Sequence, residues 1–327
     1  MSSVAIIGAG LAGLVIARRL RAHANVRIFE KSRGAGGRIA TRYAGDFEFD
    51  HGAQFFTAHT QEFARFLDPM IEQGIVANWP ARFAELNRNE VKAQRDWTLD
   101  YPHYVGVPRM NVIGKHLADG LNISFETEVK RIARESGRWV LFDQANHSLG
   151  EYDWLVLTAP PPQTATLAEM VPQLVTLCQE RTMSGCYSLM LGFEQPFDLG
   201  WDAALVANAD ISWVSVNSSK PGRGDAHTLL VHSTNAWADA NLDAEPESVI
   251  HYLMGELADV AGDRVARASH QALHRWRYAN IGKHGEPTSF LDTELQVAAA
   301  GDWFVRGRIE AAYTSASDLS ARLRESI

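Results

Sequence analysis

The sequence is poor in cysteine, in long apolar runs and in clustered positive charge. Its 327 residues include two cysteines, Cys178 and Cys186, in no CxxC or metal-ligand spacing, so we expect two reduced thiols. No stretch of about 18 apolar residues occurs, and the apolar start at Val4 soon reaches Gly8, so we expect neither a membrane span nor a signal peptide. The formal net charge of -8 argues against nucleic acid and against an anionic membrane as partners. We therefore expect a cytoplasmic protein.

Motifs for metal binding and for nucleophilic catalysis are also missing. His270 and His274 have the spacing of metal ligands on a helix, but the residues around them alternate like a strand and no third ligand accompanies them. The serines form no nucleophile elbow. We expect no metal ion. Internal repeats and long linkers are absent, and the hydrophobic content of 46% is enough for one large domain or two intermingled lobes.

A dinucleotide-binding motif opens the chain. Residues 4–7 predict a short buried strand, residues 8–13 follow with the sequence GAGLAG, and helical spacing begins at Leu14. A second strand, residues 26–29, ends at Glu30. This strand–helix–strand context gives the GxGxxG pattern its meaning.

Each position of this motif has a physical role. Gly8 allows the tight turn, Gly10 lets a pyrophosphate approach the backbone, and Gly13 lets the helix pack on the strand. The amino end of the helix presents free N–H groups and a positive dipole to the phosphates. Glu30 would accept hydrogen bonds from ribose hydroxyls.

The next residues distinguish FAD from NAD. Residues 31–38, KSRGAGGR, resemble the second fingerprint of the glutathione-reductase-type flavoproteins, in the amine-oxidase and phytoene-desaturase branch. The resemblance implies that the glycines lie under the pyrophosphate of FAD and that Arg38 pairs with it. A bidentate guanidinium suits a diphosphate.

The resemblance extends along the whole chain. Residues 41–49 read as a hairpin that leads to Gly52-Ala53-Gln54, which in this family lies along the edge of the isoalloxazine ring. The strand-like residues 122–129 imply that Val129 contacts the adenine through its backbone. Residues 300–303, AGDW, match the third fingerprint, in which Asp302 binds a ribityl hydroxyl.

A final helix near residues 308–316 would point its positive end at the N1/C2=O edge of the flavin. The family usually has glycine where this chain has Ala311 and Ala316, so we expect looser backbone contact there. No residue for covalent flavin attachment stands out, and we expect non-covalent FAD. The predicted cofactor contacts are Gly8, Gly10, Leu11, Ala12, Gly13, Glu30, Lys31, Gly37, Arg38, Gly52, Ala53, Gln54, Phe55, Val129, Asp302, Ile309 and Glu310.

The predicted fold class is α/β (α+β overall), with a Rossmann-type FAD-binding lobe and an inserted, mainly antiparallel sheet that forms the substrate lobe. Strand-like runs at residues 187–193, 211–216 and 229–233 and an amphipathic helix near residues 247–260 supply the second lobe. We expect the FAD-binding domain to comprise residues 1–55, 109–162 and 271–327, and the substrate domain residues 56–108 and 163–270.

A second resemblance is narrower. Residues 274–279, HRWRYA, taken with residues 30–38 and 50–56, resemble the renalases, and the length suits their short bacterial members. The resemblance implies an FAD-dependent oxidase that takes a hydride from 2- or 6-dihydro-NAD(P), regenerates NAD(P)+ and reduces O2 to H2O2. Such a substrate needs no strong base, because its own ring nitrogen drives hydride loss.

Candidate substrate contacts are neutral, aromatic or cationic side chains of the second lobe: Tyr187, Trp213, His232, Asn235, Arg277 and Tyr278. No catalytic residue is assigned, and His51 fits a structural role as well as a catalytic one. An FAD-dependent amine oxidase is an alternative, although Lys283 alone among the six lysines lies near a flavin-side motif. A non-catalytic flavin-binding redox sensor is a second alternative. Carotenoid and porphyrinogen dehydrogenases are usually much longer and carry a membrane-binding patch.

Overall fold

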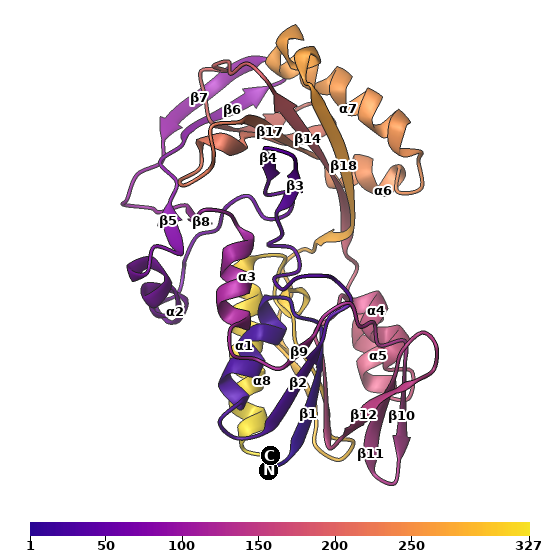
Figure 1. Cartoon of the computed structure of the whole chain (residues 1–327). Helices are drawn as coiled ribbons and strands as arrows, with labels where there is room; N and C mark the ends of the chain where they lie inside the picture. Colours follow the sequence, from indigo (N-terminus) through magenta and orange to yellow (C-terminus); the bar gives the residue numbers. More distant parts are fainter. The chain divides into compact units, whose positions relative to one another are not determined.

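The structure, a computed structural model, covers residues 1–327 and divides into two units, each built from separate stretches of the chain (Figure 1). Unit 1 comprises Met1–Arg38, Ile113–Met183 and Ile281–Ile327. Unit 2 comprises Ile39–Val112 and Ser184–Asn280. Both chain ends therefore belong to unit 1.

A six-stranded sheet forms the centre of unit 1, in the order β19-β20-β13-β1-β2-β9. All neighbours pair in parallel except β19 and β20. β1 and β13 are almost wholly buried and apolar, as is typical of strands covered on both faces of a parallel sheet. α1 and α8 pack against each other, where Arg19 donates to the Tyr313 hydroxyl over 2.9 Å (Figure 1). The Rossmann-type fold is confirmed.

The elements of unit 1 are β1 (Ser3–Ile7), α1 (Leu11–Leu20), β2 (Asn25–Phe29), α3 (Asn111–Ala118), β9 (Ile123–Ser124), β10 (Arg131–Glu135), β11 (Arg138–Phe142), β12 (Ser148–Tyr152), β13 (Trp154–Leu157), α4 (Pro161–Leu167), α5 (Pro172–Gln179), β19 (Phe290–Asp292), β20 (Val297–Ala299), η3 (Asp302–Phe304) and α8 (Ile309–Arg324). Strands β10, β11 and β12 form a separate antiparallel sheet. The strand expected over residues 122–129 is reduced to β9, because residues 126 and 127 turn to hydrogen-bond with the Glu30–Ser32 backbone.

Unit 2 is built on a seven-stranded sheet in the order β18-β14-β17-β16-β15-β6-β7, antiparallel except between β15 and β6. The mainly antiparallel second lobe is therefore confirmed. Its elements are β3 (Arg42–Ala44), β4 (Phe47–Phe49), α2 (Gln61–Glu72), β5 (Val76–Asn78), β6 (Arg82–Asn87), β7 (Glu90–Asp96), β8 (Tyr104–Gly106), β14 (Ser184–Phe193), β15 (Ala203–Ala207), β16 (Ile211–Val216), η1 (Asn217–Ser219), β17 (His227–Ser233), α6 (Asn235–Ala240), α7 (Pro246–Ala261), η2 (Asp263–Arg267) and β18 (His270–Asn280).

The two faces of this sheet differ. On one, the helix face, Leu189 and Val231 pack in a core with Leu253 and Leu257 of α7. On the other, the Ser188 face, four side chains form a row across β16, β17, β14 and β18, because Trp213, His232, Ser188 and His274 are successive partners in the strand register. Partners directly opposite in neighbouring strands lie on one face.

The division between units differs from the expected domain boundaries. Residues 39–55 belong to unit 2, because Phe49 of β4 packs in a small core with Met190 and Leu230. Residues 271–280 also belong to unit 2, as part of β18, which pairs with β14. Residues 163–183, which carry α4 and α5, belong to unit 1.

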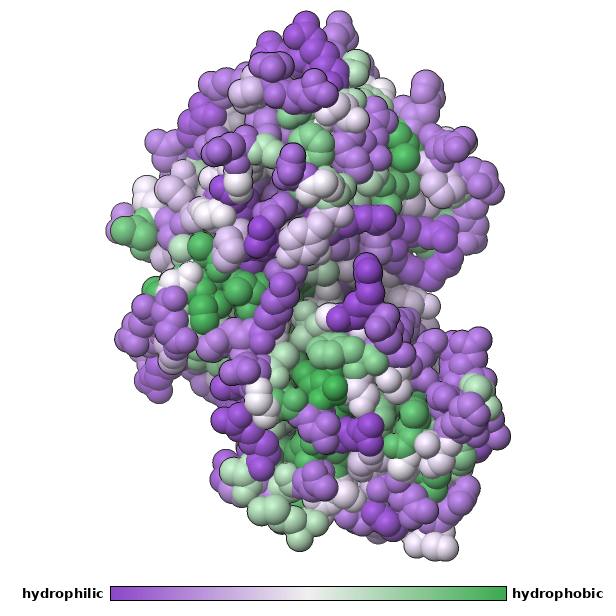
Figure 2. All heavy atoms as spheres, in the orientation of Figure 1, coloured by the Kyte–Doolittle hydropathy of each residue, from purple (hydrophilic) through white to green (hydrophobic).

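Most of the surface seen in Figure 2 is hydrophilic, with smaller hydrophobic areas in each unit. No helix of the chain combines the length and the apolar character that crossing a membrane requires.

Both cysteines are free and buried, and burial raises the pKa of each thiol to about 12. The thiols therefore stay protonated and unreactive at neutral pH.

Candidate FAD and substrate site

The turn between β1 and α1 requires glycine at two positions. Gly8 has a φ of +108°, and a Cβ there would lie 2.7 Å from Thr158 Oγ1. A Cβ on Gly13 would lie 2.1 Å from the carbonyl oxygen of Gly8, so no other residue fits without moving the backbone. The first bond within α1 runs from Leu14 N to Gly10 O over 3.0 Å. The N–H groups of the three residues before Leu14 therefore have no partner within the helix and can face an anion.

Glu30 lies directly after β2 and is 8% exposed. Its Oε2 accepts a hydrogen bond from Ala9 N over 2.8 Å, and its Oε1 accepts one from Ser32 N over 2.8 Å. The carboxylate is therefore fixed beside the glycine turn, with acceptor capacity remaining for ribose hydroxyls.

A second glycine segment lies against the first. Gly36 N donates to Ala9 O over 2.8 Å, and a Cβ on Gly37, whose φ is +57°, would lie 3.3 Å from Gly10 Cα. A Cβ on Gly114 of α3 would lie 2.7 Å from Gly36 Cα. The two backbone segments approach so closely because neither carries side chains. The resulting cradle suits the diphosphate of a dinucleotide.

Arg38 and Asp302, far apart in the sequence, form a bidentate ion pair. One bond joins Arg38 Nη1 to Asp302 Oδ2 over 2.8 Å, and a second joins Arg38 Nη2 to Asp302 Oδ1. Asp302 is 5% exposed and opens η3. The resemblance assigns these two residues to adjacent parts of FAD, the pyrophosphate and the ribityl chain, and the structure brings them together in unit 1.

The remaining predicted contacts of unit 1 lie near the same elements. Thr127 N donates to Glu30 O over 2.9 Å, which places the segment leading to Val129 beside Glu30. Ile309 and the buried Glu310 begin α8, whose amino end has no side-chain cap. Lys31 is exposed. The predicted contacts around the turn, Glu30 and the cradle lie at the carboxyl ends of β1 and β2, where ligands bind in open α/β sheets.

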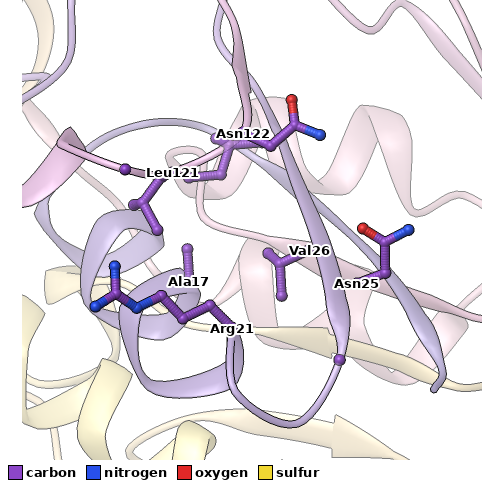
Figure 3. A pocket seen from close by; sticks show the side chains of 9 residues that line it. Ala17, Arg21, Asn25, Val26, Leu121 and Asn122 are labelled. Carbon is purple, nitrogen blue, oxygen red and sulfur yellow. The ribbon is translucent and has the colours of Figure 1, made fainter.

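A hollow of about 180 Å³ lies elsewhere in unit 1 (Figure 3). It is lined by Ala17 and Arg21 of α1, by Asn25 and Val26 at the start of β2, and by the Leu121–Asn122 segment, together with other residues. Because it borders the amino end of β2 and the carboxyl end of α1, it is separate from the dinucleotide cradle.

In unit 2 the segment Asp50–Phe55 is held by the side chain of Gln54. The Gln54 amide nitrogen donates to Asp50 O and, over 3.1 Å, to Gly52 O. Its amide oxygen accepts hydrogen bonds from Ser215 Oγ over 3.0 Å and from Lys220 Nζ over 3.3 Å. Gly52 and Ala53 are thus fixed on a rigid turn of unit 2.

Beneath this turn lies a buried charge network. Asp50 contacts both Lys220, whose Nζ lies 3.4 Å from Asp50 Oδ2, and Arg223. The Lys220 side chain is 0% exposed and also donates to Asn217 Oδ1 over 2.9 Å. Burial lowers the pKa of Lys220 to about 8, although Asp50 opposes this shift. Burial by itself would raise the pKa of Asp50, but Lys220 and Arg223 outweigh it and hold that pKa below its ordinary value.

His51 is anchored through its backbone. Its carbonyl oxygen accepts hydrogen bonds from Ser188 Oγ over 2.6 Å and from Trp276 Nε1 over 2.8 Å. The imidazole stacks on the Trp276 ring at 5.2 Å. Burial, followed by nearby His274, lowers the pKa of His51 to about 4. The imidazole is therefore neutral at neutral pH.

The structure divides the predicted substrate residues between the two faces of the sheet. Trp213 and His232 lie on the Ser188 face. Tyr187 is 2% exposed in the core of the helix face, and its hydroxyl donates to Asn241 O over 2.9 Å. Arg277 pairs with Asp243 over 2.9 Å.

Asn235 and Tyr278 complete the predicted set. Asn235 donates to Gly185 O and accepts a hydrogen bond from Asn280. Tyr278 is partly buried in β18. Tyr187, Arg277 and Asn235 thus have hydrogen-bond or ion-pair partners within unit 2.

Sequence reasoning missed two groups. Phe55 contacts Trp97, His103 and Trp213 with ring centroids 4.8, 5.1 and 5.4 Å away, and Trp97 stacks on His103 at 3.6 Å. The sequence shows that residues 56–108 are rich in aromatic side chains, but His103 was not singled out.

The second group contains Lys220, which was set aside because it lies far in sequence from any flavin motif. Two positive charges a few residues after a buried strand, Lys220 and Arg223, were the available signal.

Comparison with known proteins decides the family. Residues 60–317 match the family described as flavin containing amine oxidoreductase, and residues 6–69 match an NAD(P)-binding Rossmann-like domain. The chain belongs to the flavin-containing amine oxidoreductases. It is therefore an FAD-dependent oxidoreductase, in a family whose members act on small molecules with O2. The glycine cradle, Glu30 and the Arg38–Asp302 pair fit FAD.

Several known proteins are similar to this chain over nearly its full length. Renalase from Mus musculus is 22% identical over 100% of both sequences. A provisionally assigned protoporphyrinogen oxidase from Exiguobacterium sp. 255-15 has a TM-score of 0.78 and 13% identity, covering 100% of this chain and 99% of its own. Cyclohexylamine oxidase from Brevibacterium oxydans has a TM-score of 0.73 and 14% identity, covering 99% of each chain. These structural similarities show a shared fold.

Proposed function

We propose that this flavoenzyme oxidises 2- or 6-dihydro-NAD(P) to NAD(P)+ and passes the electrons to O2. The overall reaction is dihydro-NAD(P) + H+ + O2 → NAD(P)+ + H2O2, in which the dihydropyridine loses a hydride and O2 gains two electrons and two protons. Non-covalently bound FAD supplies the two-electron acceptor that O2 reoxidises. Similarity to renalase over the whole length of both chains supports the proposal.

The observation that carries the proposal is that the row of side chains on the Ser188 face carries no charge of its own. Its row of Trp213, His232, Ser188 and His274 contains no carboxylate. Burial lowers the pKa of His232 to about 4, and burial lowers the pKa of His274 as well. The imidazoles therefore remain uncharged at neutral pH.

A neutral aromatic surface fits a dihydronicotinamide better than an amine. Amines are mostly protonated at neutral pH, so an amine oxidase must bind a cation and remove its proton. Asp50, the carboxylate of the Asp50–Phe55 segment, is engaged by Lys220 and Arg223 and is not available for that work. A dihydronicotinamide loses its hydride without a base, and an aromatic ring such as that of Phe55 can stack on the nicotinamide ring before and after it becomes a cation.

The test is anaerobic mixing of the holoenzyme with 2-dihydro-NAD, 6-dihydro-NAD, ordinary NADH and a panel of primary amines, following flavin absorbance at about 450 nm. We expect rapid bleaching by one or both isomers and slow or no bleaching by NADH and amines. Bleaching by amines alone would contradict the proposal and favour an amine oxidase. Bleaching by none of these compounds would favour a redox sensor.

A further inference from the structure

Two neighbouring side chains of the Ser188 face have buried polar atoms without a partner. Trp213 Nε1 and His232 Nε2 are buried, and neither makes a hydrogen bond. Of the buried side-chain atoms in this condition, only these two belong to residues that are direct partners in the strand register. The two residues are called the Trp213–His232 pair below. An unpaired buried polar group is costly, so two at adjacent positions favour a ligand that pairs with both.

The register of β16 brings the pair together. It shifts between Ile211 and Trp213, which leaves Trp213 opposite His232 of β17. Partners in adjacent antiparallel strands have Cβ atoms about 5 Å apart, so both rings can contact one small polar group. Trp213 is 6% exposed, and its ring centroid lies 5.4 Å from that of Phe55. Within unit 2 the pair therefore combines two polar atoms with an aromatic wall.

The two atoms have opposite roles in hydrogen bonding. The indole nitrogen of Trp213 can only donate. Burial lowers the pKa of His232 to about 4, although a hydrogen bond from the imidazole to the His51 backbone opposes this shift. The imidazole is therefore neutral at neutral pH, and its single ring proton is used in that bond. Since Nε2 is the nitrogen without a partner, it is left as an acceptor.

A donor beside an acceptor matches a primary carboxamide, which carries an acceptor oxygen and a donor nitrogen on one carbon. A carboxylate fits less well because it cannot donate, and a protonated amine fits less well because it cannot accept.

We propose that the Trp213–His232 pair binds the carboxamide of the nicotinamide ring, with Trp213 Nε1 donating to its oxygen and His232 Nε2 accepting from its nitrogen. This inference rests on the proposed function and deepens it, because 2- and 6-dihydro-NAD(P) carry a carboxamide that simple amines lack. A carboxamide held at both atoms fixes the orientation of the ring from which the hydride leaves. The pair would therefore select nicotinamides over other reduced rings.

The experiment compares two substrates that differ only in this group. The first is the dihydro-NAD isomer that reduces the wild type. The second is its 3-acetylpyridine counterpart, in which a methyl ketone keeps the carbonyl and lacks the N–H groups. For the wild type we expect KM to be about tenfold higher with the ketone, because His232 Nε2 is then left unpaired.

Variants assign the two bonds separately. His232→Leu should raise KM for the carboxamide about tenfold and leave KM for the ketone nearly unchanged. His232→Gln, whose side-chain oxygen can accept, should restore part of the preference for the carboxamide. Trp213→Phe should raise KM about equally for both substrates, since both contain the carbonyl. The matched controls, Trp237→Phe in α6 and His251→Leu at an exposed position of α7, should behave as the wild type.

Binding of nicotinamide itself to the holoenzyme tests the pair without turnover, by calorimetric titration. We expect the wild type to bind nicotinamide about tenfold more tightly than 3-acetylpyridine, and His232→Leu to bind the two equally. Equal affinities for amide and ketone in the wild type would overturn the inference, as would an undiminished preference for the amide in His232→Leu. The wild-type comparison needs no variant, so the inference stays testable if His232→Leu does not fold. Reduction of the flavin by amines alone would instead overturn the proposed function, while nicotinamide binding would still report on the pair.

Discussion

In unit 1 the backbone holds the cofactor segments, whereas in unit 2 buried side chains hold the segment that follows β4. Gly8, Gly13 and Gly36 allow main-chain atoms to approach one another closely, and the phosphates would face N–H groups. Asp50 and Gln54, by contrast, sit in a network of side chains drawn from β16 and η1 and the loop beyond it. A backbone cradle depends on the absence of side chains, and a charge network depends on every partner being present.

The sharpest test of this contrast is Asp50→Asn. Loss of this carboxylate leaves Lys220 and Arg223 buried without a counter-charge, so we expect the free energy of unfolding to fall by about 3–5 kcal/mol in urea titrations. The matched control is Asp46→Asn in the exposed hairpin turn, which should change stability by less than about 0.5 kcal/mol. Equal stability of the two variants would mean that the network does not hold unit 2 together.

In unit 1 the corresponding change is Gly13→Ala. Its new Cβ would lie 2.1 Å from Gly8 O, so the turn must open. We expect a loss of about 3 kcal/mol in stability and purification of the variant largely without FAD, seen as loss of the yellow colour. Gly34→Ala is the control, because a Cβ there meets nothing within 4 Å. A fully yellow Gly13→Ala protein would show that the turn is less tight than described.

Lys220→Met should cost about 2 kcal/mol at neutral pH, because Arg223 still pairs with Asp50. The pH dependence of the unfolding free energy tests the state of this lysine more directly. The pKa of Lys220 is about 8 in the folded chain and about 10.4 when unfolded, so between these values the unfolded chain binds more protons. Stability from this group therefore rises with pH across that window.

The measurement is the difference in unfolding free energy between the wild type and Lys220→Met at several pH values from neutral to alkaline. We expect the stability of the wild type to increase relative to that of the variant as pH rises. A difference that stays constant with pH would mean that folding does not lower the pKa of Lys220.

The smallest effect is expected for Arg38→Lys. An ammonium keeps the charge but cannot form the two parallel bonds that Arg38 makes with Asp302, so FAD affinity should fall about tenfold, measured by fluorescence titration of the apoprotein. Arg33→Lys, at an exposed position of the same loop, is the control. An unchanged FAD affinity would remove Arg38 from the cofactor site.

The same contrast explains what the sequence could reveal. Strand β1, the turn to α1 and Glu30 were predictable because each depends on residues adjacent in sequence and on glycine, whose conformational freedom is specific. The role of Lys220 was not, because its partners Asp50 and Gln54 lie far away in the chain. Tyr187 lies in the core of the helix face, whereas its neighbour Ser188 faces the opposite side of the sheet, and a sequence without its strand register does not show which face a residue takes.

The order of segments along the chain has a consequence for biosynthesis. The chain passes between the two units four times, and β20, Asp302 and α8, which complete unit 1, follow every segment of unit 2 along the chain. Asp302 lies 264 residues beyond its partner Arg38. Unit 2 can therefore assemble before these segments are translated, whereas the FAD-binding unit cannot be complete until they have been made. FAD capture is then a late event in maturation, and a nascent chain stalled before β20 should carry no flavin.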